Sequence, residues 1–276
     1  MSLTKPSFRS RGLCAKNHMK TKHVVNFSGG VCSFLAAHRV VSKYGKEGVT
    51  LLFADTQRES KELYRFCRDA EEFLGIPLTK VSAGKSVWEV CFEEHMIANS
   101  RVPICSMRLK REILDEWTCK NCDPSETILY FGMDYNEIGR LEALRKRYPN
   151  WQCEAPMQEP PFLDKDQMLD EVRELGLDPS KQYALGFSHD NCGGRCFASG
   201  QANWALALQH DREGYLEDEK MEQQFRAKFG DYSILKDRRN KQSRPMSLKE
   251  FRERIEKGDL HDKYDFGGCG CSVNFA

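Results

Sequence analysis

Apolar positions in the first half of the chain alternate between strand and helix patterns. Residues 23–27 form a short apolar strand pattern that stops at a Ser-Gly-Gly turn, after which apolar residues recur at helical spacing to residue 41. A continuous apolar run at 49–54, typical of a strand buried on both faces, is followed by helical spacing from Leu63 to Leu74. Residues 76–81 and 127–131 are further strand candidates. Alternating units of this kind predict an α/β fold with a parallel, doubly wound sheet.

The pattern changes after about residue 160, where helices predominate. Asp164 caps a predicted helix that ends at Gly176, a second helix covers about 200–210, and Ser247 opens a third. The chain closes on a Gly-Gly-Cys-Gly-Cys segment that is too rich in glycine for regular structure. We therefore expect three parts: a basic N-terminal arm (1–22), an α/β domain (23–210) and a small helical, cysteine-bearing C-terminal extension (211–276).

Charge is balanced over the chain as a whole. The 276 residues include 42 Lys and Arg and 41 Asp and Glu, a formal net charge of +1, which excludes a globally basic chromatin protein or an acidic tail. Mean hydropathy is −0.63 and no run reaches the roughly 18 apolar residues of a membrane helix, so we expect a cytoplasmic protein with no membrane contact. The arm fits a solvated tail, a transit peptide or a nucleic-acid contact, because its basic residues precede any acidic one: Lys5, Arg9, Arg11, Lys16, Lys20 and Lys22.

The turn between the first strand and the first helix has the chemistry of an oxyanion site. Glycines let backbone N–H groups approach an anion, the helix N-terminus adds partial positive charge, and two serines supply hydroxyl donors. The alternative is an ordinary glycine turn, which the strand before it and the helix after it make less favourable. The Gly-Lys-Ser/Thr ending of a Walker loop is missing. The predicted anion-binding loop consists of Ser28, Gly29, Gly30, Val31, Cys32 and Ser33.

This loop resembles that of the PP-loop ATP pyrophosphatases, and specifically the phosphoadenosine phosphosulfate (PAPS) reductase-like branch, whose loop is Ser-Gly-Gly-x-Asp-Ser. Stretches at 53–59, 105–111 and 132–140, and the closing Cys-Gly-Cys, are also similar to that branch. The resemblance implies a Rossmann-like sheet of the adenine nucleotide alpha-hydrolase type over residues 23–210, with ATP or PAPS as the bound nucleotide. It further implies nucleotide contacts from Asp55, Thr56, Arg108, Lys110, Gly132, Asp134, Glu137 and Arg140.

One position departs from the branch, because Cys32 stands where the family has aspartate. A thiol is a poor ligand for Mg²⁺, which prefers hard oxygen atoms. Either Asp55 or Asp134 supplies the oxygen for a bound Mg²⁺, or the loop holds a preactivated nucleotide such as PAPS.

Twelve cysteines suggest metal binding, redox chemistry or burial rather than disulfides. A His-Asp-Asn-Cys-Gly-Gly-Arg-Cys segment brings Cys192 and Cys196 together among glycines, as a metal centre requires. A [4Fe–4S] cluster, a zinc ion and simple burial of the thiols all remain open. The family resemblance adds Cys105 as a further ligand and implies that Cys105, Cys269 and Cys271 are catalytic, with the two tail thiols as additional metal ligands.

These features predict an enzyme that joins nucleotide activation to sulfur chemistry. In the preferred hypothesis ATP adenylates an acceptor, a sulfur atom from a donor protein attacks, and AMP leaves. The basic arm and a second basic cluster from Lys236 to Arg244 favour tRNA or DNA as the acceptor. The alternatives are a PAPS reductase, in which a tail thiolate attacks PAPS, and a non-catalytic nucleotide-sensing scaffold; either type of protein could be a homo-oligomer. The basic residues at 145–147 fit a solvated helix face.

Overall fold

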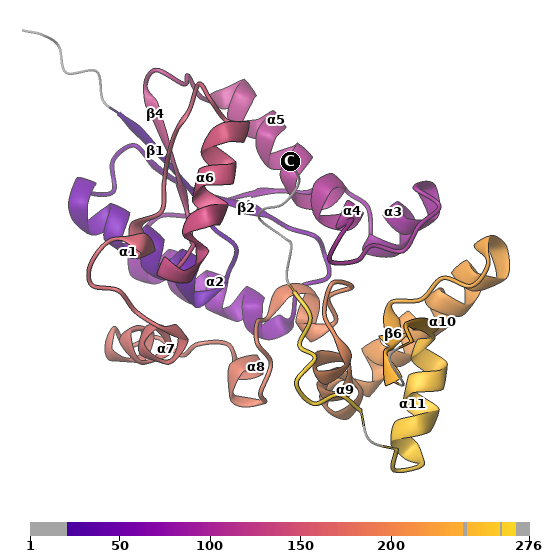
Figure 1. Ribbon diagram of the computed structural model, residues 1–276. Helices are drawn as coiled ribbons and strands as arrows, with labels where there is room; N and C mark the ends of the chain where they lie inside the picture. The colour runs from indigo at the N-terminus through magenta and orange to yellow at the C-terminus, as the bar shows by residue number, and fades with distance from the viewer. Residues whose placement is uncertain (1–20, 240–241, 260, 269–276) are drawn as a thin grey trace, which may run out of the picture.

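The computed structural model describes residues 21–239, 242–259 and 261–268. Its centre is a five-stranded sheet in the order β3-β2-β1-β4-β5 in which every pairing is parallel, so the predicted α/β fold is confirmed (Figure 1). The order reverses between β1 and β4, which places the ligand crevice of such a sheet at their carboxyl ends. The strands are β1 (Lys22–Asn26), β2 (Val49–Ala54), β3 (Leu78–Val81), β4 (Thr127–Phe131) and β5 (Gln152–Glu154).

Helices cover both faces of the sheet, because successive strand residues point to opposite sides. Val25, Leu51 and Tyr130 are buried against one set of helices, whereas their neighbours Val24, Leu52 and Leu129 are buried on the other side. The first face is covered by α1 (Val31–Tyr44), α2 (Lys61–Leu74) and α7 (Lys165–Glu174), and the second by α5 (Glu112–Asn121) and α6 (Ile138–Arg147).

The helix that leads into β4 contains a π-helical segment. α4 (Ile104–Ser106), η1 (Met107–Arg111) and α5 follow one another without a break, and η1 has the wider π-helical hydrogen-bonding pattern. Short π segments within helices are frequent at functional sites, because they change the direction in which side chains point. Here the π segment carries Lys110 and Arg111 toward the carboxyl edge of the sheet.

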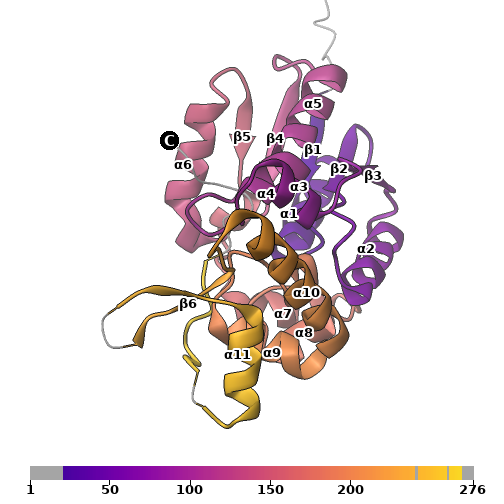
Figure 2. The same ribbon diagram turned by 90° about the vertical axis from the view of Figure 1, so that its right-hand side faces the viewer.

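A second hydrophobic core lies beside the sheet. It contains residues from both sides of the domain boundary expected at residue 210. α3 and its neighbours up to Leu109 pack with Phe187, Phe197 and the C-terminal helices around Trp204 and Phe225 (Figure 2). Its elements are α3 (Val87–Glu93), α4, α9 (Gln201–His210), α10 (Arg212–Phe229), β6 (Leu235–Asp237), β7 (Arg244–Met246) and α11 (Leu248–Glu256). β6 and β7 form an antiparallel pair.

α10 is the longest helix of the described chain and was not predicted from the pattern. Its buried face carries carboxylates as well as Tyr215 and Phe225. Glu222 is fully buried and accepts the N–H groups of Ile234 at 2.9 Å and Leu248 at 2.6 Å, which fixes the start of α11. Hydrophobic periodicity cannot reveal a helix whose buried positions are partly acidic.

The last described residues fold back onto the segment that follows Cys196. Ser199 and Gly267 form an isolated antiparallel bridge, and Gly268 N–H donates to the carbonyl of Ala198 at 3.2 Å. Cys269 and Cys271 lie outside the described residues, so their predicted roles remain predictions. None of the helices in the described part of the chain has the length and apolar character needed to span a membrane.

Candidate functional site

Hydrogen bonds within the chain give the predicted anion-binding loop its shape. Ser33 Oγ accepts the Ser28 N–H and the Ser28 hydroxyl, each at 3.1 Å, and donates to the Gly30 carbonyl at 2.8 Å. Gly30 precedes the first turn of α1, and no side chain caps that helix. The loop is therefore organised by its own serines, and the N-cap residue of α1 contributes no side-chain oxygen at the helix end where an anion would bind.

Two glycines allow close packing around this loop. Gly29 has φ +79°, and a Cβ there would lie 2.6 Å from Leu63 Cδ2. A Cβ on Gly132, which follows β4, would lie 2.6 Å from the Cα of Ser33 and 2.7 Å from its N. The end of β4 thus touches the backbone of the loop, and only glycine permits this approach.

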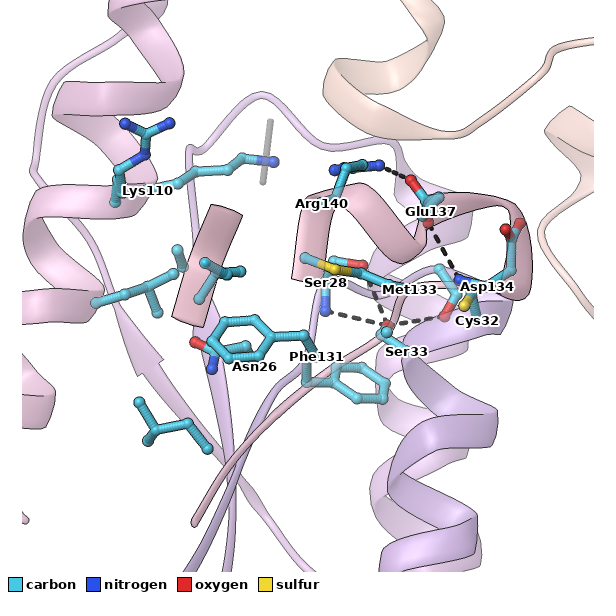
Figure 3. A pocket seen from close by; sticks show the side chains of 18 of the residues that line it. Asn26, Ser28, Cys32, Ser33, Lys110, Phe131, Met133, Asp134, Glu137 and Arg140 are labelled. Atoms are coloured by element: carbon cyan, nitrogen blue, oxygen red, sulfur yellow. Dashed lines mark hydrogen bonds and ion pairs between the residues drawn. The ribbon is translucent and has the colours of Figure 1, made fainter. Parts of the chain in front are cut away.

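A cavity of about 990 Å³ opens beside the loop at the carboxyl edge of the sheet. Figure 3 shows Ser28, Ser33 and Cys32 on one part of its wall, with Lys110 and Arg140 entering from opposite sides. Of the predicted nucleotide-binding residues, the lining includes Ser28, Gly30, Val31, Cys32, Ser33, Lys110, Gly132, Asp134, Glu137 and Arg140. The structure therefore brings together most of the residues that the family resemblance implied.

Three predicted nucleotide contacts lie outside this lining and have partners in the fold. Asp55 accepts the Tyr64 hydroxyl at 2.6 Å, and the Thr56 hydroxyl donates to Glu59 at 3.0 Å. Arg108 forms ion pairs with Glu94 and Glu112 on the surface. Gly29 also lies outside the lining, on the side of the loop that packs against Leu63 of α2.

Cys32 is a neutral thiol in this setting. Burial, followed by the nearby Asp134 carboxylate, raises the pKa of Cys32 to about 12. A protonated thiol neither attacks as a nucleophile nor binds Mg²⁺. The side chain of Asp134 accepts the Asn136 N–H at 2.8 Å, and Glu137 forms an ion pair with Arg140. Asp134, which the sequence offered as an oxygen donor in place of Cys32, therefore lines the cavity close enough to Cys32 to raise its pKa.

Lys165 and Tyr183 belong to the site but were not predicted. Both line the cavity, and the Lys165 ammonium lies 4.2 Å from the centre of the Tyr183 ring. Although Lys165 as a whole is exposed, desolvation of its ammonium lowers the pKa of Lys165, against the opposing charge of Asp134. The Val31 N–H donates to the Tyr183 hydroxyl. A lysine in the first turn of a helix opposes the helix dipole, and this unfavourable position is the sequence signal that distinguishes Lys165.

Glu59 connects the cavity to the cysteine loop. Its side chain is 1% exposed and lies 3.2 Å from Lys110 Nζ. The other oxygen of the same carboxylate accepts the Cys192 N–H at 2.8 Å. One buried carboxylate therefore contacts both the lysine of the cavity and the first cysteine of the predicted metal centre.

The cysteine loop has an unusual backbone and an environment that favours thiolate. Residues 192–194 are left-handed, with φ 54° at Cys192, 62° at Gly193 and 79° at Gly194. A hydrogen bond from Cys196 lowers the pKa of Cys192. Burial and the charge of Glu59 oppose this, and the cations Lys110 and Arg58 lower the pKa further. Cys105 also lies close to Cys192, but burial raises its pKa to about 12.

Asp190 anchors the start of this loop. It accepts the hydroxyls of Ser60 at 2.8 Å and Ser180 at 2.5 Å, and these serines are the N-caps of α2 and of α8 (Lys181–Ala184). Burial raises the pKa of Asp190 to about 6. The cysteine loop is thus tied to two helix N-termini.

Within residues 21–239, 242–259 and 261–268, no group of three or more His, Cys, Asp or Glu side chains is arranged to hold a metal ion. The described residues supply the adjacent thiols of Cys192 and Cys196, which suit a soft metal, but not a complete donor set. Within the described part of the basic cluster between Lys236 and Arg244, Arg239 and Arg244 share the carboxylate of Asp237, and Arg238 pairs with Asp265. The basic arm up to Lys20 lies outside the described residues.

No family model and no curated protein matches this sequence. Similar solved structures include a PAPS reductase from Candida auris in complex with phosphate (TM-score 0.42, 15% identity, covering 60% of this chain and 78% of that chain). An NH₃-dependent NAD synthetase from Campylobacter jejuni in complex with nitrate has a TM-score of 0.41 and 14% identity, with 90% of each chain covered.

The U34-tRNA thiolase NcsA from Methanococcus maripaludis, with its [4Fe–4S] cluster, has a TM-score of 0.40 and 18% identity over 60% of this chain and 62% of that chain. TM-scores near 0.4 do not by themselves assign an activity to this chain. All three structures are members of the PP-loop ATP pyrophosphatase superfamily, the family that the loop motif resembles.

Proposed function

We propose that this protein is a PP-loop enzyme that binds ATP in the cavity beside α1 and adenylates an acceptor. An acceptor oxygen attacks the α-phosphorus, pyrophosphate leaves, and a sulfur nucleophile then attacks the activated carbon so that AMP departs with the oxygen. In this proposal the acceptor is a nucleic acid and the sulfur comes from a donor protein.

The observation that carries this proposal is the contact of Glu59 with both halves of the site. Lys110 lies at the cavity and Cys192 in the cysteine loop, and both contact the same buried carboxylate. The proposed nucleotide site and the proposed thiol site are therefore adjacent. Catalysis gains most from groups that are already held in position before the substrate binds.

Phosphates would bind at the N-terminus of α1, with positive charge from Lys165, Lys110 and Arg140 around them. Asp134 is the carboxylate best placed to hold Mg²⁺ near the phosphates, since the Cys32 thiol is neutral. Cys192 and Cys196 would ligate a [4Fe–4S] cluster or zinc together with Cys105 and a tail cysteine, and such a centre would supply thiolate-bound metal next to the nucleotide.

A second candidate function is reduction of PAPS by a tail thiolate. One observation favours it, namely that the loop has an uncharged Cys32 at the position of the branch's aspartate, and PAPS is already activated and needs no Mg²⁺-assisted release of pyrophosphate. The two reactions release different products, AMP with pyrophosphate in one case and sulfite with adenosine 3′,5′-bisphosphate in the other.

Product analysis separates the candidates. Anaerobically purified protein is incubated with ATP or PAPS, with tRNA or duplex DNA and a persulfide donor, and its products are resolved by chromatography. The Lys165→Ala variant should lose most of the activity, whereas Lys181→Ala, at the equivalent first position of α8 but 78% exposed, should retain it. Products from neither nucleotide would refute both reactions and leave the nucleotide-sensing scaffold.

A further inference from the structure

The cavity extends well beyond the loop, to an end formed by α5 and α6. Four side chains line this region: Arg111 at the end of η1, Asp115 of α5, and Arg147 and Tyr148 at the end of α6. Its volume of about 990 Å³ is at the upper limit of the roughly 300–1,000 Å³ typical of small-molecule sites. The α5–α6 end therefore offers room for a ligand group apart from the one held at α1.

The charges at this end do not balance. The Asp115 carboxylate accepts the Tyr148 hydroxyl on one oxygen and pairs with Arg147 at 2.6 Å on the other. Within the described residues no hydrogen bond or ion pair engages Arg111, and its Nε is shielded from solvent without an acceptor. Burial, and then the charge of Arg147, lower the pKa of Arg111, and the nearby Tyr148 and Asp115 oppose this only in part. A shielded guanidinium beside a second guanidinium is costly unless an anion joins them.

Between the two ends the cavity has an apolar floor. Leu52, Leu129 and Phe131 project from the sheet, and Leu114, Leu144 and Trp151 complete the lining. A flat aromatic ring, such as a nucleobase, is the kind of group that such a surface accepts. The arrangement is polar at one end, apolar in the middle and cationic at the other end.

We propose that Arg111 and Arg147 form a second anion subsite, which binds a phosphate ester on a ribose separate from the phosphates at α1. This proposal deepens the proposed function, since it assumes that a nucleotide occupies the α1 end. The phosphate has two chemical sources, a 3′-phosphate on the nucleotide itself or a phosphodiester of the nucleic-acid acceptor. Arginine suits either one, because its planar fork donates two parallel hydrogen bonds to phosphate oxygens.

The test compares the parent protein with Arg111→Gln, Arg111→Lys and Lys120→Gln. Lys120→Gln is the control, because it removes an exposed charge from the same continuous helix. Calorimetric titrations use AMP, adenosine 3′,5′-bisphosphate and a short single-stranded oligonucleotide, and the oligonucleotide is titrated both with and without AMP. If the phosphate is on the nucleotide, the parent should bind the bisphosphate about tenfold more tightly than AMP, and Arg111→Gln should abolish that difference. If it belongs to the acceptor, Arg111→Gln should weaken oligonucleotide binding about tenfold and leave both mononucleotides equal.

In either case Arg111→Lys should be intermediate, Lys120→Gln should resemble the parent, and Arg111→Gln should unfold at no lower urea concentration than the parent. The subsite is refuted if Arg111→Gln changes none of these affinities, weakens AMP and the bisphosphate equally, or lowers the unfolding midpoint. If the parent fails to bind AMP, the proposed function fails, and the oligonucleotide titration without AMP still decides whether Arg111 binds phosphate.

Discussion

Replacement of Gly132 by alanine tests the contact between the end of β4 and the anion-binding loop. The new Cβ would lie 2.6 Å from the Cα of Ser33. Ordinary carbon contacts are about 3.5 Å or longer, so the two backbones must separate by about 0.9 Å. Neither partner is a flexible side chain, and the displaced residue is the serine that holds the Ser28 N–H and the Gly30 carbonyl.

The expected loss of stability follows from this geometry. Overpacking of a closely packed contact costs about 1–3 kcal/mol, and the loss of a hydrogen bond at Ser33 adds about 1 kcal/mol. We expect a total loss of about 2–4 kcal/mol. With a urea dependence of about 3 kcal/mol/M, the unfolding midpoint should fall by about 0.7–1.3 M. Because the loop moves, affinity for ATP should also fall about tenfold.

Gly139→Ala provides a matched control for this experiment. Gly139 lies in the first turn of α6, and a Cβ there would meet nothing within 4 Å. Alanine in a helix is favoured over glycine by at most about 1 kcal/mol, so the midpoint should stay level or rise. Urea unfolding followed by circular dichroism measures both variants. A Gly132→Ala protein with the midpoint of the parent would refute the close approach of β4 to the loop.

Three further predictions concern single side chains. Burial raises the pKa of Glu222 to about 7 from 4.5, so its contribution to stability should decrease as pH rises from about 4.5 through about 7; urea unfolding at pH 5 and 8 should show that loss in the parent but not in Glu222→Gln, and equal pH dependence would contradict it. Iodoacetamide should label Cys32 at least about a hundredfold more slowly than the exposed Cys119, because the raised pKa keeps the Cys32 thiol protonated; peptide mapping by mass spectrometry that finds similar rates would disprove this assignment. Tyr183→Phe should bind ATP about two- to tenfold more tightly by calorimetry, since the Val31 N–H is released for phosphate, and weaker binding would mean that the hydroxyl contacts the ligand instead.

Features of the fold that depend on local chemistry could be predicted from the sequence. Asp164 and Ser247 begin helices as predicted, because the side chain of each accepts the backbone N–H of the residue three positions later. The strand before Ser28 and the helix after Gly30 are likewise present. Hydrophobic runs also located the central strands, since a parallel strand covered on both faces is apolar throughout.

The parts that could not be predicted depend on contacts between distant segments. Lys165 belongs to the candidate site because it lies near Cys32 and Asp134. Glu59 belongs to it because its carboxylate contacts Lys110 and Cys192. No pattern in the sequence pairs these positions. Similarly, the cationic run at 145–147 fitted a solvated face, whereas the structure places Arg147 at the cavity as well as at the surface.

The composition of the second core has a consequence for the order in which the chain folds. Trp88 packs against Phe197 and Phe225, which are synthesised more than a hundred residues later. The five strands, by contrast, are complete by Glu154. During synthesis the sheet can therefore assemble first, while the segment around Trp88 remains without its apolar partners. Chains that terminate near residue 210 lack α10 and α11, and they should aggregate through this uncovered surface rather than fold as a smaller protein.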